Sequence, residues 1–317
     1  CCPMESNSLN PAIVTSVDLT LDLIRRDVKH TLLDKFEFVT SPSKVTDGVR
    51  TIFMPSVPAD HPSLECLEDG RWKEYEAIVF ASHWQQQMYN LFLDIPYGAG
   101  IVLRNAIDTL PNKLARNKPK NFTTILYVGE LNRGLDLAHG AFKKLTRKMH
   151  ENARMIVVTN LTNPEEMTPS LQALSDEIRD NPKVSVYRDA TEEELMSYMQ
   201  EAHIFVYPTD YPEMSYTPLL KAISAGCMCI HSSTGSFPEM CLGVTSMYGI
   251  IEDRPTHGVK FLHELENALN VYANPTKRER LIEHLNTAKH TVDAIYSWRR
   301  RKEQWEDLLR NLLTSSA

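Results

Sequence analysis

The stretch HIFVYPTDYPEMSYTPLLKAISAGCMCIHSS, residues 203–233, indicates the class of fold most clearly. It opens with an apolar, β-branched run typical of a buried strand, continues as an amphipathic helical pattern, and ends in a second apolar run. Two buried strands joined by one helix are expected to lie parallel in a sheet that helices cover. The polar residues 210–217 then follow the carboxyl end of a parallel strand, where ligands bind in such sheets.

The same alternation of strand and helix extends through the middle of the chain. TEEEL, residues 191–195, is a capped helix start, because Thr191 and Glu194 have the spacing of a capping box. We therefore predict a doubly wound, Rossmann-like domain at residues 111–290. Its further strands are expected at 123–129, 153–160 and 183–189, and its helices near 134–149, 165–180, 191–202 and 217–225.

The first third of the chain predicts a second, smaller Rossmann-like domain at residues 1–110. Its helix is expected at HWQQQMYNLF, residues 83–92, and a polar linker with two prolines, DTLPNKLARNKPKNF, follows at 108–122. The tail over 275–313 has a helical pattern, with residues 291–317 as a C-terminal helix. With two such domains, the cleft between them is the expected site. Strands of the first domain are predicted at 36–41, 51–56, 77–82 and 100–104.

Length and composition set the class of protein. A chain of 317 residues is too long for one ordinary core, and its 42% apolar and 24% charged content is that of a globular protein. The net charge of −7 argues against a nucleic-acid partner. No apolar run reaches the roughly 18 residues that span a bilayer. The opening CCPMESNSLN lacks the features of a signal peptide and an initiator Met, so we interpret the chain as a fragment or a trimmed form.

The cysteines carry no metal-binding or disulfide signature. Six are present, with no C-x-x-C pair and no Cys/His cluster at zinc spacing; Cys1 and Cys2 open the chain. Cys227 and Cys229 alternate along one apolar run, so we interpret them as reduced core residues. Reduced buried thiols favour a cytoplasmic protein.

The loop after strand 123–129 is a candidate anion site. In GELNRGLDL, Gly129 and Gly134 bracket a tight turn, and Arg133 stands directly before the helix. A helix N-terminus has a partial positive charge and free N–H groups, to which Arg133 adds a full charge. The alternative is a surface arginine in an ordinary turn between strand and helix.

The loop after strand 203–209 is more specific. Glu213 precedes a helix that Thr217 and Pro218 begin, so its carboxylate is placed to accept hydrogen bonds from sugar hydroxyls. The alternative is a carboxylate that only caps the helix. Lys221 follows two helical turns later, and its alternative is a solvated lysine.

Two further motifs have simpler interpretations. SSTGSFPEM, residues 232–240, with Gly235 and a helix opening at Pro238, is either an ordinary loop or backbone that approaches a ligand. The basic run 299–302 between Trp298 and Trp305 predicts a solvated helix face with the tryptophans packed inward. Its alternative is a phosphate contact to an acceptor or a membrane surface.

Taken together and in order, these motifs resemble the retaining GT-B glycosyltransferases of the large group with a Glu-x(7)-Glu motif, the glycosyl transferases group 1. The resemblance rests on ILYVGELNRGLDL, on VSVYRDATEEELMSYMQEAHIFVYPTDYPEMSYTPLLKAISAGCMCIHSSTGSFPEM and on YSW with a final helix. Upstream, AIVFASHWQQQMYNLFLDIP and IVLRNAID are similar to the end of the family's first domain. The resemblance as a whole covers about residues 77–313.

The resemblance implies a fold and a reaction. The fold would be GT-B, with two Rossmann-like domains facing across a cleft and a C-terminal helix packed back on the first domain. The reaction would move a sugar from a nucleotide-sugar donor to an acceptor hydroxyl, with retention at the anomeric carbon and without a metal or cofactor. The acceptor would be a glycan, a lipid-linked molecule or a protein, with at most peripheral membrane contact.

The resemblance also implies residue roles. The catalytic residues would be Arg133, which holds the donor diphosphate, and Glu213, which contacts the transferred sugar. The donor-binding residues would be Gly129, Arg133, Lys221 and the segment whose backbone amides approach sugar and phosphate, namely Met214, Ser215, Tyr216 and Thr217.

The chain departs from the family pattern at three places. Lys221 stands where the family has the glutamate that holds the ribose, and lysine cannot accept hydrogen bonds. Glu130 stands where the family commonly has a second basic residue. The opening strand and glycine-rich loop are not recognisable, so the first domain is interpreted as short or truncated. For the family's sugar-facing histidine the candidates are Ser56, Asp60 and His61.

Two alternatives to a glycosyltransferase remain open. A catalytically degenerate GT-B module would act as a glycan-binding protein or a partner subunit, and Lys221 and Glu130 favour it. Another GT-B enzyme, such as a nucleotide-sugar epimerase, is the third interpretation. The retained Glu213 and Arg133 favour the transferase.

Overall fold

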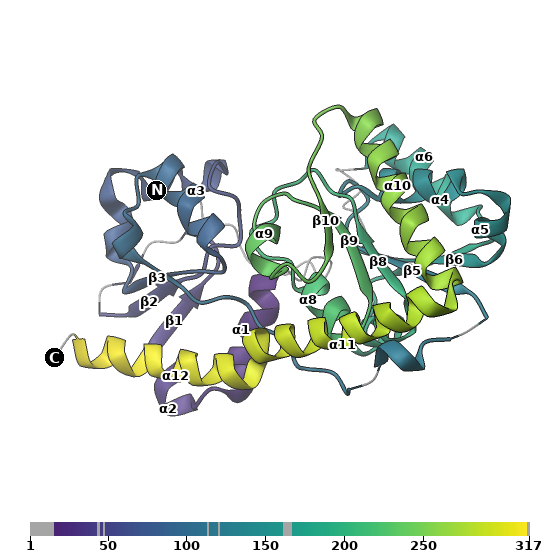
Figure 1. The fold of residues 1–317 in the computed structure, drawn as a ribbon. Coiled ribbons are helices and arrows are strands. Elements are labelled where there is room, and N and C mark those ends of the chain that lie inside the picture. Colours follow the sequence, from purple (N-terminus) through teal and green to yellow (C-terminus); the bar gives the residue numbers. More distant parts are fainter. Residues whose placement is uncertain are drawn as a thin grey trace. The chain divides into compact units, whose positions relative to one another are not determined.

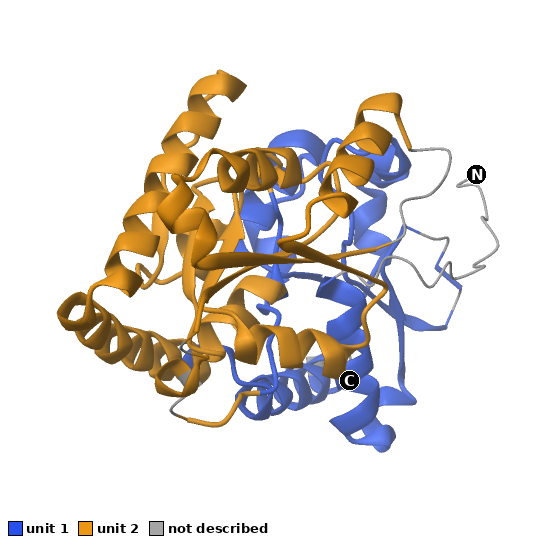
Figure 2. Ribbon diagram, turned by 90° about the vertical axis from the view of Figure 1, so that its right-hand side faces the viewer, with its two compact units in different colours: residues 1–108, 213–217, 295–317 blue, residues 109–212, 218–294 orange. Residues whose placement is uncertain are grey.

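The computed structural model describes residues 16–42, 45–46, 48–112, 114–119, 121–160 and 167–315. Cys1, Cys2 and the first two residues of the helix predicted over 165–180 lie outside these residues. The chain forms two compact units (Figure 2). The first comprises Cys1–Asp108, Glu213–Thr217 and Ile295–Ala317, and the second comprises Thr109–Pro212 and Pro218–Ala294.

The first unit is built on a parallel sheet with the strand order β1-β2-β3-β4. Figure 1 labels β1, β2 and β3 of this sheet. All four strands were predicted: β1 (Phe36–Val39), β2 (Arg50–Phe53), β3 (Ala77–Phe80) and β4 (Gly100–Val102). The predicted helix is α3 (His83–Leu93), which begins where the Ser82 side chain accepts a hydrogen bond from the Gln85 amide. The remaining elements are α1 (Ser16–Asp27), α2 (His30–Leu33) and the 3-10 helices Pro62–Glu74 and Tyr97–Ala99.

The C-terminal helix α12 (Trp298–Ser315) packs against α1 and α2, as predicted (Figure 1). Trp298 and Trp305 are buried in one apolar cluster with residues of α1, β2 and β3. The Trp298 indole N–H donates to Asp27 Oδ2 at 2.6 Å. The C-terminal helix therefore supplies part of the core of the first unit.

The prediction of a solvated basic face on α12 is wrong for one residue. Arg301 is buried, whereas Arg299 and Arg300 are exposed. Arg301 stands three residues after Trp298 and four before Trp305, and side chains at this spacing share one helix face. Burial lowers the pKa of the Arg301 guanidinium to about 10.

The second unit is built on a parallel sheet with the order β10-β9-β8-β5-β6-β7. The predicted strands are β5 (Thr123–Val128), β6 (Ala153–Thr159), β7 (Val184–Arg188), β8 (Ile204–Tyr207) and β9 (Met228–Ser232). The strand β10 (Ser246–Tyr248) was not predicted. The two parallel sheets confirm the predicted α/β class with two Rossmann-like units for the described residues.

The helices predicted for the second unit are present with one break, whereas the helix over 254–273 was not predicted. The helix expected over 134–149 divides into α4 (Leu135–Lys144) and α5 (Arg147–Glu151), because Thr146 caps a new helix through the Met149 amide. The capping box of Thr191 and Glu194 is confirmed. The other helices are 3-10 Leu114–Asn117, α6 (Pro169–Arg179), α7 (Glu192–Glu201), α8 (Thr217–Ser224), α9 (Phe237–Met240), α10 (Arg254–Ala273) and α11 (Pro275–Tyr296).

Two further features of the structure concern the predicted core cysteines and the length and polarity of the helices. Cys227 and Cys229 are free and buried, and desolvation raises the pKa of both thiols. Within the described residues, every helix is too short or too polar to cross a bilayer.

Candidate active site

The strand order of the second unit creates a switch point between β5 and β8. From β5 the chain proceeds to β6 and β7 on one side, and then returns to β8 and β9 on the other. The loops after β5 and β8 consequently leave the sheet in opposite directions. In open parallel sheets this is where ligands bind, at the carboxyl ends of the strands.

Two glycines bring these loops close together. Gly134 has φ +91°, and a Cβ atom there would lie 2.5 Å from the backbone oxygen of Pro208. Gly129 has φ +148°, and its Cβ would lie 2.9 Å from the ring of Tyr207. Both positions therefore require glycine, for backbone conformation and for space.

Arg133 lies between the two glycines and stacks on the loop after β8. Its guanidinium carbon lies 3.1 Å from the centre of the Tyr211 ring, and its Nε lies 3.4 Å from Glu130 Oε2. The side chain keeps 22% of its surface exposed. The predicted placement of a cation beside the N-terminus of α4 is present, but Glu130 partly offsets its charge.

The loop after β8 is fixed from several sides. The Tyr211 amide donates to Thr209 Oγ1 at 3.0 Å, and the Ser232 hydroxyl donates to the Thr209 carbonyl. Thr209 and Ser232 are both fully buried. Ser232, the last residue of β9, thus supports the neighbouring loop. Gly235, in the turn between β9 and α9, has φ +57°.

Arg254, at the start of α10, ties the first turn of α4 to the loop after β8. It donates two hydrogen bonds to the Asp136 carboxylate, at 2.7 and 3.1 Å, and pairs with Asp210. These carboxylates raise the pKa of Arg254, Asp136 most strongly. Sequence reasoning missed this residue. The available signal was the helix start at Asp253, whose side chain accepts from the Thr256 amide.

Lys221 is buried and paired, so the interpretation of a solvated lysine is wrong. Its side chain is 9% exposed, and Nζ lies 2.6 and 2.7 Å from the two oxygens of Glu192. Glu192 is the first residue of α7 and is 54% exposed. The ammonium is thereby neutralised from a helix that precedes it by 29 residues in sequence.

The segment 213–217 is held by residues of the first unit. Ser82 donates to the Met214 carbonyl at 2.7 Å, Asn105 donates to the Ser215 hydroxyl at 3.0 Å, and the Thr217 amide donates to Ser16 Oγ at 3.2 Å. Tyr216 and Thr217 are buried, and Glu213 is half-buried. This grouping was not anticipated from the sequence, which placed the segment in the second domain.

The three candidates for a sugar-facing side chain also lie in the first unit. Ser56 donates to the Thr40 carbonyl at 3.0 Å. His61 is exposed, and its Nδ1 lies 2.8 Å from Ser63 Oγ at the start of a 3-10 helix. Asp60 is exposed. Ser56 and His61 therefore already form hydrogen bonds within the first unit.

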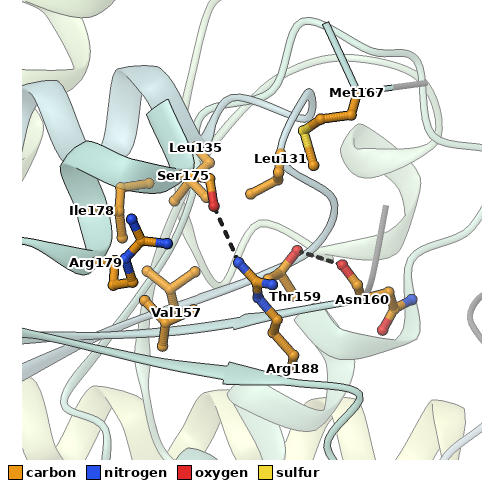
Figure 3. Close-up of a pocket in the computed structure, with 11 residues that line it drawn as sticks. Leu131, Leu135, Val157, Thr159, Asn160, Met167, Ser175, Ile178, Arg179 and Arg188 are labelled. Carbon is orange, nitrogen blue, oxygen red and sulfur yellow. Dashed lines mark hydrogen bonds between the residues drawn. The ribbon is translucent and has the colours of Figure 1, made fainter. Parts of the chain in front are cut away.

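A pocket of about 440 Å³ opens at the carboxyl ends of β6 and β7 (Figure 3). Thr159, Asn160 and Arg188 line it from the strand ends, and Arg188 donates to Ser175 Oγ at 3.2 Å. Leu131 and Leu135, which flank Arg133 in sequence, line the other side. The pocket and the switch-point loops thus share one edge of the sheet, the edge that the sequence predicted.

Comparison with solved structures identifies the fold class. The structure is similar to a glycosyltransferase from Rickettsia africae ESF-5, with 14% identity and a TM-score of 0.67, covering 98% of this chain and 84% of that one. It is also similar to Anabaena HepE in complex with UDP-glucose, with 12% identity and a TM-score of 0.65, covering 84% and 72%. A third similar structure is sucrose-phosphate synthase from Thermosynechococcus elongatus, with 15% identity and a TM-score of 0.61, covering 84% and 69%.

The fold is therefore of the GT-B class. Residues 108–243 match the family Glycosyl transferases group 1. No curated protein sequence matches the chain.

Proposed function

We propose that the protein transfers a sugar from a nucleotide-sugar donor to an acceptor hydroxyl, with retention at the anomeric carbon. The observation that carries this proposal is the switch point of the second unit, where Arg133 stacks on Tyr211 beside the N-terminus of α4. The family match and the UDP-glucose complex of the similar HepE support a nucleotide-sugar as donor. The proposed acceptor is a glycan, a lipid-linked molecule or a protein.

The donor diphosphate is proposed to bind at Arg133. When the bond from the anomeric carbon to the diphosphate breaks, its electron pair moves to the departing phosphate oxygen. A guanidinium and helix N–H groups stabilise that charge without a metal ion. The tight packing of Gly134 on Pro208 fixes the loop before the donor arrives, so little reorganisation is needed.

The nucleoside is proposed to occupy the pocket at the ends of β6 and β7. Its volume of about 440 Å³ lies within the range of small-molecule sites. Lys221 is not assigned a phosphate contact, because both oxygens of Glu192 already hold its ammonium. Lys221 departs from the family pattern, and the Glu192 carboxylate of α7 neutralises its positive charge.

Arg133→Ala is expected to weaken UDP binding at least about tenfold, or roughly 1.4 kcal/mol, because it removes the cation beside the α4 N-terminus. Isothermal titration calorimetry at two salt concentrations measures the loss, which should shrink at high salt. Arg147→Ala removes a fully exposed arginine of the same unit and is the matched control. Unchanged UDP affinity in Arg133→Ala would place the phosphates elsewhere.

Glu213→Gln is expected to lower turnover at least about tenfold, or roughly 1.4 kcal/mol of barrier, because it keeps the side-chain shape and removes the charge proposed to contact the transferred sugar. Transfer is measured with a panel of nucleotide-sugars, and NMR of the product reports the anomeric configuration. Glu193→Gln changes an exposed glutamate of α7 and is the control. Full activity in Glu213→Gln would remove this residue from the mechanism. Absence of turnover with every donor would favour the non-catalytic alternative.

A further inference from the structure

A second cavity, of about 460 Å³, lies at the edge of the sheet opposite the proposed donor site. Thr123, Asn152 and His203 line it, and they stand at the amino ends of β5, β6 and β8. The end of α10 and the start of α11 complete its wall. Because the switch point lies at the carboxyl ends of the same strands, the proposed transfer reaction makes no use of this cavity.

The lining of this cavity is strongly basic. Four basic side chains, Arg116, Lys118, Lys148 and Arg278, face one carboxylate, that of Glu279. The chain as a whole has a net charge of −7, so this cluster opposes the overall charge. A basic cavity in an acidic protein concentrates anions locally.

Two of these cations are available to a ligand. Glu279 pairs with Arg116 at 2.6 Å. Across the described residues, no carboxylate forms an ion pair with Lys148 or Arg278. Lys148 is exposed and Arg278 half-buried, so both reach the opening of the cavity.

The buried polar groups at the base are already satisfied. The Thr124 amide donates to His203 Nδ1 at 3.1 Å, so Nε2 has the hydrogen that it donates to the Pro119 carbonyl at 2.8 Å. Burial lowers the pKa of His203 to about 4, with smaller contributions from the charges of Lys118, Arg154 and Arg278. His203 is therefore neutral at pH 7, and Lys118 donates to the Met199 carbonyl at 2.9 Å.

Aromatic rings supply the apolar part of the cavity. Phe122 lines it and stacks under the Arg154 guanidinium at 4.0 Å. Tyr272 also lines it, and its hydroxyl donates to the His203 carbonyl at 2.8 Å. Amide side chains of Asn121 and Asn270 add hydrogen-bonding groups. Cations, rings and amides together suit an organic anion better than a bare ion.

We propose that this cavity is a second ligand site that binds a phosphomonoester, with Lys148 and Arg278 on the phosphate and Phe122 and Tyr272 against the organic part. A volume of about 460 Å³ accommodates a sugar phosphate. The phosphate can come from a soluble metabolite or from a lipid headgroup. The site is separate from the donor site and does not depend on transfer activity.

The test measures binding of glucose 6-phosphate to the full chain by calorimetry, and binding to phosphatidylcholine vesicles with and without phosphatidic acid by sedimentation. The double variant Lys148→Glu/Arg278→Glu is expected to weaken binding at least about a hundredfold, since each reversed charge contributes about tenfold. UDP binding should stay unchanged in the variant, and saturating UDP should not displace glucose 6-phosphate.

The matched control is Arg147→Glu/Arg280→Glu, which reverses exposed charges on the same two helices outside the cavity. It should bind like the unmodified chain. Binding of glucose 6-phosphate alone assigns the site to a soluble ligand, and binding of phosphatidic acid vesicles alone assigns it to a headgroup. Failure of both probes to bind, equal loss in the control, or displacement by UDP would each overturn the proposal.

Discussion

Lys221→Glu is expected to lower the free energy of unfolding by about 3 kcal/mol, because it places a carboxylate at a buried position against Glu192. Glu192 is half exposed and can turn toward water, but a side chain at position 221 is 9% exposed and cannot. The loss in free energy of unfolding should therefore lie at the low end of the range that is observed when a buried ion pair is broken. Thermal unfolding should show a fall of about 6–10 °C.

Two further variants test whether the loss of stability comes from the broken Lys221–Glu192 pair or from charge reversal in general. Lys260→Glu reverses the same charge in α10, where Lys260 pairs with Glu264 at 2.6 Å but is 41% exposed. It should cost under about 1 kcal/mol. The swapped variant Glu192→Lys/Lys221→Glu should recover about half of the loss, as expected when two residues in contact are changed together. An unchanged unfolding temperature in Lys221→Glu would mean that the pair does not form.

Gly134→Ala is expected to cost about 2–4 kcal/mol of stability and to weaken UDP binding at least about tenfold. The new Cβ would meet backbone, the Pro208 carbonyl at 2.5 Å and its carbon at 2.8 Å, which cannot move aside as a flexible side chain would. The left-handed φ of +91° adds strain for alanine. The clash should separate the loops after β5 and β8, and with them Arg133 from Tyr211.

Gly140→Ala is the matched control for this prediction. Gly140 lies within α4, six residues from Gly134, and a Cβ there has open space. Alanine should leave stability unchanged or raise it by about 0.5–1 kcal/mol, because it favours the helix. Chemical denaturation measures stability, and calorimetry measures UDP affinity. Equal behaviour of the two variants would contradict the close approach of the loops.

The elements that the sequence predicted well are those with a local signal. The strands around Ile125 and Phe205 are continuous apolar runs, and such runs in alternation with helices indicate a parallel sheet. The helix at Thr191 was predicted from its capping box, which depends on residues three apart. By contrast, β10 has three residues and an exposed Met247, too little pattern to recognise.

The parts of the site that the sequence did not predict depend on distant residues. Lys221 stands where a motif expects a carboxylate, but its partner Glu192 lies in another helix, and no spacing rule joins the two. Arg254 reaches Asp136 over a sequence separation of 118 residues. Arg133, Gly129 and Gly134 were predicted together because one short turn contains all three. Motifs within one short segment could be recognised in the sequence, whereas ion pairs between distant elements could not.

The grouping of residues 213–217 with the first unit determines how the protein can be divided. Ser16, Ser82 and Asn105 hold this short segment, although it lies in the sequence between β8 and the body of α8. A recombinant fragment of residues 109–294 would carry the segment without its three polar partners. A fragment of residues 1–108 would lack the segment and also α12, whose tryptophans fill its core. Neither unit is a continuous stretch of chain, so gene-level truncation cannot isolate either one intact.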